Sequence, residues 1–103
     1  MVRMARRAKP PPVTYLTSDG VWPLGPFRDN APPYVAAVAT LARNVIGEAG
    51  RRGLSQRGLA RDTGVTLATI NHIYTGKVIP DTATLAALEH ALGIILWFGP
   101  PAN

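Results

Sequence analysis

The fold of this chain is decided by the stretch from Leu54 to Gly76, which reads LSQRGLARDTGVTLATINHIYTG. Apolar or small residues recur at helical spacing on both sides of Gly64, where the pattern is interrupted once. Gly64 can take a positive φ at the end of a first short helix, and Thr66 is placed to cap a second one by accepting a bond from an unpaired backbone N–H. The stretch therefore predicts a helix-turn-helix, whose second helix over residues 66–75 can be presented to the major groove of DNA.

A longer spaced pattern surrounds this motif. Its residues are Leu54-Ser55-Gln56, Leu59-Ala60, Gly64-Val65-Thr66, Thr69-Ile70, Ile73, Gly76-Lys77, Pro80, Leu85, Leu88 and Ala91-Leu92-Gly93. Over roughly Val35 to Ile95 the pattern resembles the XRE/Cro-type helix-turn-helix family, which contains phage repressors, Cro proteins and many antitoxins. The resemblance implies an all-α fold, a lambda-repressor-like bundle of four to five helices.

Helical spacing also extends to both sides of the motif. Apolar residues recur every three to four positions over residues 34–49, and Asn30 or Asp29 is placed to cap this helix, which opens with two prolines. A last regular helix follows the motif, with Asp81 as its cap. We therefore expect the DNA-binding domain to cover residues 33–98.

The segment before this domain divides into two parts. Residues 1–9 predict a flexible basic arm, which either contacts DNA or serves as a solubilising tail. The charged residues of the arm are Arg3, Arg6, Arg7 and Lys9. Residues 10–32 form a proline-rich extension in which no regular helix can persist.

The extension still contains signals of structure. Residues with β propensity flank Asp19-Gly20, which indicates a short hairpin turning at that dipeptide. Trp22 and Phe27 are too large to leave in water without cause, so we expect the extension to pack on the helical core as a strap. The alternative is a surface that binds a partner protein.

The C-terminal end of the domain carries a run of large apolar residues, namely Ile94, Ile95, Leu96, Trp97 and Phe98. This run either packs back on the helix over residues 34–49 or forms an interface with a second subunit. Residues 99–103 follow as a C-terminal tail.

Composition excludes several classes of protein. A chain of 103 residues with 47% apolar residues has room for one domain with one core. It has no cysteine, and its longest apolar run is far shorter than the ~20 residues of a membrane helix. No nucleophile setting, phosphate loop, paired carboxylates or metal-ligand spacing can be recognised. We therefore expect no enzyme, no metal, no cofactor, no membrane partner and no small-molecule ligand.

Positive charge is concentrated near the motif. Eleven Lys and Arg residues against six Asp and Glu give a formal net charge of +5. Outside the arm, the basic residues that gather near the predicted DNA-reading helix are Arg51, Arg52, Arg57, Arg61 and Lys77. Positive charge around a helix-turn-helix is what binding to DNA phosphates requires.

The resemblance also implies roles for single residues. The family's base-reading positions fall on Leu67, Ala68 and His72. Its phosphate-contacting positions fall on Gln56, Thr66 and Thr69.

Residue chemistry adds to these assignments. Leu67 and Ala68 suit thymine methyl groups, and His72 can donate to guanine N7 or O6. Asn71 lies on the same outward side of the helix and suits adenine, so it joins the base-contacting set. The cations expected to contact the DNA backbone are Arg57, Arg61 and Lys77.

Together these features favour a sequence-specific transcriptional repressor, either a phage immunity repressor or a Cro-like regulator, from a phage of an actinobacterial host. It would insert the helix over residues 66–75 into operator DNA and occlude a promoter, in the bacterial cytoplasm. The alternatives are an antitoxin of a toxin–antitoxin pair and a DNA-bending recombination factor. Double-stranded DNA is the expected partner, bound by a homodimer or by a monomer.

Overall fold

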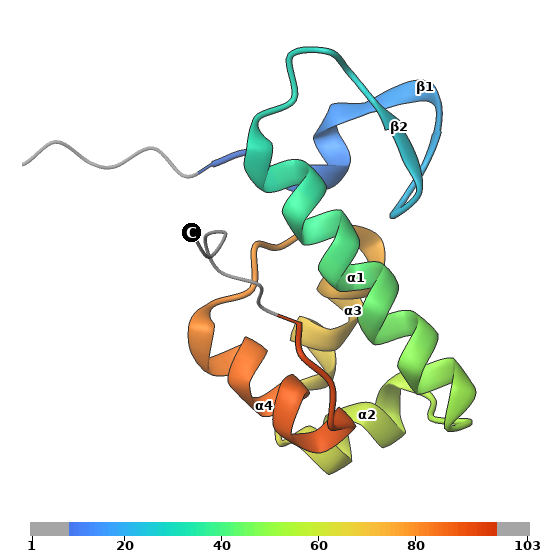
Figure 1. Cartoon of the computed structure of the whole chain (residues 1–103), viewed down its shortest axis with the longest axis vertical. Coiled ribbons are helices and arrows are strands. Elements are labelled where there is room, and N and C mark those ends of the chain that lie inside the picture. The colour runs from blue at the N-terminus through green and yellow to red at the C-terminus, as the bar shows by residue number, and fades with distance from the viewer. Residues whose placement is uncertain (1–8, 97–103) are drawn as a thin grey trace, which may run out of the picture.

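Four helices and a small N-terminal hairpin make up the computed structural model, which describes residues 9–96. The elements in chain order are the 3₁₀ turn η1 (Pro12–Tyr15), strands β1 (Leu16–Val21) and β2 (Gly25–Phe27), and helices α1 (Pro33–Arg51), α2 (Gln56–Thr63), α3 (Leu67–Thr75) and α4 (Thr82–Leu92). The predicted helical bundle with a helix-turn-helix is confirmed. Its motif is formed by α2 and α3 (Figure 1).

Helix α1 is the element that connects the two ends of the molecule. Its N-terminal end lies beside the hairpin and its C-terminal part lies against α3 and α4 (Figure 1). The face it turns inward carries Val35, Val38, Leu41, Ala42, Val45 and Ala49, all buried. Side chains from the other three helices complete the core, namely Leu59, Ile70, Ile73, Leu88 and Leu92.

The start of α1 differs from the expectation. Pro32 occupies the N-cap position without any side-chain cap bond, and the helix begins at Pro33. Asn30 and Asp29 lie before this start, so the prediction that one of them caps the helix was wrong. The prolines supply the pre-set φ that a first turn needs, and the Val35 N–H donates to the Pro32 carbonyl at 3.0 Å.

The hairpin exists, but its turn is not at Asp19-Gly20. Strand β1 runs through that dipeptide, and the chain reverses between Val21 and Leu24, where the Leu24 N–H donates to the Val21 carbonyl at 2.7 Å. Gly20 serves a different purpose, because a Cβ there would lie 2.7 Å from the carbonyl oxygen of Pro26. The glycine thus allows the facing strand to approach closely.

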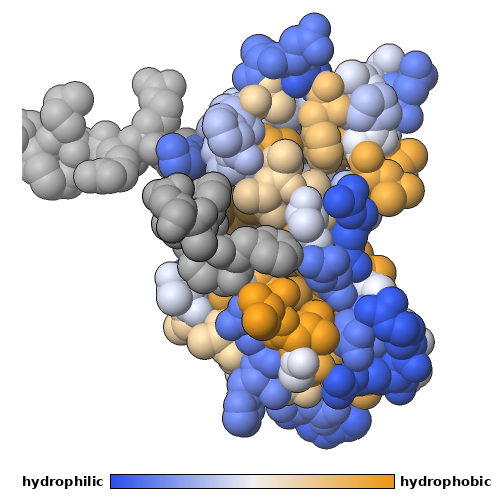
Figure 2. Space-filling view, viewed as in Figure 1, coloured by the Kyte–Doolittle hydropathy of each residue, from blue (hydrophilic) through white to orange (hydrophobic). Residues whose placement is uncertain are grey.

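The turn of the hairpin exposes apolar side chains. Val21 is 61% exposed and Leu24 is 69% exposed. Figure 2 shows this hydrophobic surface at the turn, next to hydrophilic surface. Trp22, between them in sequence, points the other way and packs against the helical core.

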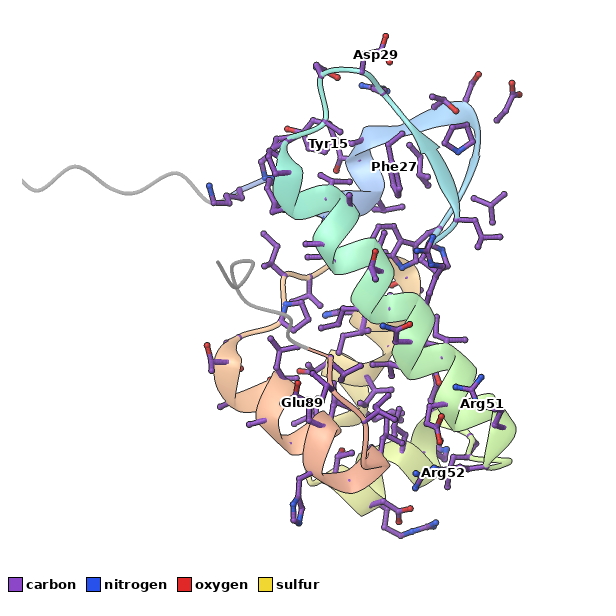
Figure 3. The ribbon with its side chains drawn as sticks, in the orientation of Figure 1. Tyr15, Phe27, Asp29, Arg51, Arg52 and Glu89 are labelled. Atoms are coloured by element: carbon purple, nitrogen blue, oxygen red, sulfur yellow. The ribbon has the colours of Figure 1, made fainter. Side chains whose placement is uncertain are left out.

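The segment after α4 returns to the core. Leu96 is buried, and its N–H donates to Glu89 Oε2 at 2.7 Å, whereas Ile95 is 72% exposed. Glu89 lies on α4, and its carboxylate holds the segment that returns to the core (Figure 3). Trp97 and Phe98, and the tail over 99–103, lie outside the described residues.

The lowered pKa values of two carboxylates predict how stability depends on pH. Bonds from Arg52 and Arg51 hold the pKa of Glu48 below its ordinary value of 4.5, and the N-cap bond from the Thr84 N–H lowers the pKa of Asp81. Because both native pKa values are lowered, their stabilising effect is present above the unfolded-state values and is lost as pH falls through the native values. We expect the melting temperature to drop in acid, and the drop to be smaller in the double variant Glu48→Gln, Asp81→Asn. Asp29→Asn, at an exposed carboxylate near the hairpin, is the control and should keep the wild-type acid profile.

Candidate nucleic-acid interface

The turn between α2 and α3 is held by its own side chains. Thr63 Oγ1 donates to the Leu59 carbonyl at 2.7 Å and accepts from the Val65 N–H at 3.1 Å. Gly64 takes a φ of 76°, as predicted, and Thr66 caps α3 by accepting from the Thr69 N–H at 3.2 Å. These bonds fix the angle at which α3 leaves the turn.

Helix α3 has one buried and one exposed face. Ile70 and Ile73 are fully buried against the core. The four residues predicted to contact bases are all exposed on the other face, namely Leu67, Ala68, Asn71 and His72. Leu67 is 38% exposed and lies in the first turn of the helix.

An open groove lies where α3 meets the start of α2. It has a volume of about 600 Å³ and is lined by Ser55, Gln56, Arg57, Leu67, Ala68 and Asn71. Two of these side chains bridge it, since Asn71 Nδ2 donates to Gln56 Oε1 at 3.2 Å. His72 does not line this groove, so the four candidate readers divide into a group of three and a separate histidine.

The predicted phosphate contacts are arranged around the groove and the turn. Ser55, which caps α2 by accepting from the Gly58 N–H at 3.0 Å, was not among the predicted site residues although it lines the groove. The signal that identifies it is its position directly before Gln56. The Thr66 hydroxyl donates to Thr69 Oγ1 at 2.9 Å, so these two predicted phosphate ligands lie side by side.

The basic cluster is smaller than its sequence indicates. Arg51 and Arg52 both pair with Glu48, at 2.7 and 2.9 Å, and Arg52 also donates to the carbonyls of Ala91 and Leu92 at the end of α4. Both arginines project at the C-terminal end of α1 (Figure 3), and Arg52 braces that end against α4. Both arginines therefore have partners within the chain, and their contribution to a basic surface beside α3 stays a prediction.

The remaining cations of the cluster stay exposed. Arg57 and Lys77 are exposed. Arg61 lies 3.5 Å from Asp62, and because both side chains are solvent-accessible, this ion pair is weak. Of the basic arm, the structure describes Lys9, whose ammonium lies 5.6 Å from the centre of the Tyr34 ring. Arg3, Arg6 and Arg7 lie outside the described residues.

The N-terminal extension, which contains η1 and the hairpin, is fastened to the C-terminal end of α3. The Trp22 Nε1–H donates to the Ile73 carbonyl at 3.1 Å, and the Val13 N–H donates to the Gly76 carbonyl at 2.9 Å. The indole lies so close to Gly76 that a Cβ there would be 2.6 Å from Trp22 Cδ2. The N-terminal extension therefore holds the last turn of α3, a contact that no sequence pattern identified.

Metal-holding clusters and membrane-spanning helices are absent from the described residues. Within 9–96, no group of three or more His, Cys, Asp or Glu side chains is placed to hold a metal ion. In the same part of the chain, every helix is too short or too polar to pass through a lipid bilayer.

Comparison with known proteins bears on the same part of the chain. Residues 49–95 match the model of a family described as helix-turn-helix. The match contains α2, α3 and α4 and leaves out the hairpin and most of α1. Comparisons with curated proteins and with solved structures gave no significant match.

Proposed function

We propose that this protein acts as a transcriptional repressor. Residues 49–95 match the model of a helix-turn-helix family, which supports a sequence-specific DNA-binding transcription regulator. It inserts α3 into the major groove of an operator and occludes an overlapping promoter. We also propose that it acts on DNA in the cytoplasm of a bacterial host. A phage immunity repressor or a Cro-like regulator is the corresponding role.

The observation that supports this proposal is the exposed face of α3. The helix is held by its N-cap at the first turn and by the Trp22 bond at the last, and the predicted base-contacting side chains on this face are exposed. A pre-ordered helix face with adjoining cations is the surface that major-groove binding needs. Repression follows if the bound domain covers a promoter.

Selection and reporter assays test the proposal directly. The purified chain is mixed with fragments of host and phage DNA, and the bound fragments are sequenced. A bound fragment is then placed over the promoter of a reporter gene. We expect the intact chain to reduce reporter expression and a variant with Ala68→Glu and His72→Ala to restore it. Specific binding without any change in expression contradicts the repressor role and favours the DNA-bending factor.

Arg57 gives a prediction about DNA phosphates. Its side chain is exposed at the groove, and we expect it to contact one DNA phosphate, which Arg57→Ala would remove. We expect weaker binding to all sequences alike and a slope of log K against log salt that is smaller by about one. Arg43→Ala, at an exposed arginine on α1 that lines no part of the groove, is the matched control and should change neither quantity.

A further inference from the structure

We infer that the Phe98 side chain occupies an apolar groove on its own chain, between the N-terminal half of α1 and the loop that joins α3 to α4. The described residues end at Leu96, so this occupant lies just outside them. The match to the helix-turn-helix family ends at residue 95 and assigns no role to the segment that follows. The groove is separate from the exposed face of α3, so filling it completes the core of the domain rather than the surface that faces DNA.

The groove is mostly apolar. It has a volume of about 420 Å³ and is lined by residues of α1, of the loop after α3, of α4 and of the segment after α4. Helix α1 contributes Ala36 and Ala37, whose small, exposed side chains leave room for a larger group. The loop contributes Ile79, which is 39% exposed although it is large and apolar. An apolar side chain placed here removes this apolar surface from water, which stabilises the folded chain.

The chain itself leads into this groove. Leu96 is buried and lines the groove, and its N–H donates to Glu89 Oε2 at 2.7 Å. The segment is therefore fixed at the last described residue. Two further residues of extended chain span at most about 7 Å, so Phe98 starts within reach of the groove. A group tethered this closely has an effective concentration on the order of millimolar or more, which favours it over the same residue of a second copy.

Burial along the segment indicates Phe98 rather than the neighbouring Trp97. Ile94 packs partly buried against the core, Ile95 is 72% exposed, and Leu96 is buried. Such alternation is typical of extended chain, in which successive side chains point to opposite sides. Continued by two residues, it directs Trp97 to the exposed side of the segment. The same continuation directs Phe98 to the side of Leu96, where the groove lies.

Alanine substitutions in the full chain test the inference. Phe98→Ala empties the groove and should lower Tm by roughly 5 to 15 °C, less than at a fully buried phenylalanine because the groove is open to solvent. Trp97→Ala, at the adjacent aromatic residue, is the matched control and should change Tm by only a few degrees. A loss of Tm that is equal or larger for Trp97→Ala overturns the assignment, and so does a Phe98→Ala variant that melts like the wild type.

A substitution on the opposite wall tests the same contact. Ala37→Leu fills the groove from α1, so Phe98→Ala should cause little further loss of Tm in that background. Ala83→Leu, at an exposed alanine of α4 that does not line the groove, is the control, and the full effect of Phe98→Ala should persist there. If Phe98→Ala costs as much beside Ala37→Leu as in the wild type, the ring does not occupy this groove.

Nuclear Overhauser effects identify which chain supplies the ring. Phe27 and Phe98 are the two phenylalanines of the sequence, so Phe98→Ala assigns the ring signals. In a mixture of isotope-labelled and unlabelled protein, we expect contacts within one chain between this ring and the methyl groups of Val38 and Ile79. Contacts between chains show that a second copy fills the groove and overturn the inference, as does a ring without these contacts. The measurements involve no DNA, so their outcome is independent of the proposed function.

Discussion

Trp22→Ala is expected to destabilise the protein by about 2 to 4 kcal/mol and to lower Tm by roughly 10 to 20 °C. The indole packs against the helical core and on Gly76, and its N–H donates to the Ile73 carbonyl. Removing it leaves a cavity and leaves the Ile73 carbonyl with the 3.4 Å bond from the Gly76 N–H, while the N-terminal extension keeps the bond from the Val13 N–H to the Gly76 carbonyl. Thermal unfolding followed by circular dichroism measures the effect.

A second substitution separates the loss of packing from the loss of the hydrogen bond. Trp22→Phe keeps an aromatic ring but has no donor, so it should cost only about 1 kcal/mol, the usual net value of one hydrogen bond. Leu24→Ala, at an exposed side chain of the same turn, should change Tm little. If Trp22→Ala melts within a few degrees of wild type, the hairpin does not hold α3 in solution.

Gly76→Ala is expected to be the second severe substitution. Its φ is 77°, where an alanine costs about 1 to 2 kcal/mol, and its Cβ would lie 2.6 Å from Trp22 Cδ2. The indole must therefore move away, which adds an overpacking cost of about 1 to 3 kcal/mol. Because the hairpin and the last turn of α3 both shift, we expect affinity for selected DNA to fall together with Tm.

Gly64 provides the matched control for this prediction. Its φ is 76°, nearly the same as that of Gly76, but nothing lies within 4 Å of the position of an added Cβ. Gly64→Ala should therefore show the backbone cost alone. The difference between the two variants measures the contact with Trp22, and this difference should vanish when both are made in a Trp22→Ala background. Equal losses in the wild-type background contradict the close approach of the indole.

The helical part of the fold was predictable because its signals are local. Gly64 marks the turn, Thr66 caps α3 and Asp81 caps α4, and each acts within four residues of its own position. Helical spacing gave the buried face of α1 for the same reason. The cap of α1 was predicted wrongly because prolines replaced the side-chain bond that Asn30 or Asp29 would make.

Contacts between distant segments were not predictable in the same way. Gly20 and Asp19 have the composition of a turn, yet a close strand approach, visible only in three dimensions, explains the glycine. Trp22 could be recognised as a residue needing cover, but its partner 51 residues away could not. Arg51 and Arg52 were counted with the DNA-facing cations because charge is read from sequence while pairing is not. The exposure of Leu67, Ala68, Asn71 and His72 follows from helical spacing. Their contacts with DNA stay a prediction.

The hydrogen bonds that fasten the N-terminal extension to the end of α3 are accepted by main-chain carbonyls, and the indole rests on a residue without a side chain. Trp22 donates to a carbonyl and rests on a glycine, and Val13 also donates to a carbonyl. Mutations among the outward residues of the helix therefore leave this anchorage intact. Descendants of this chain can change the operator they recognise one side chain at a time, without having to rebuild the support that keeps the helix in place.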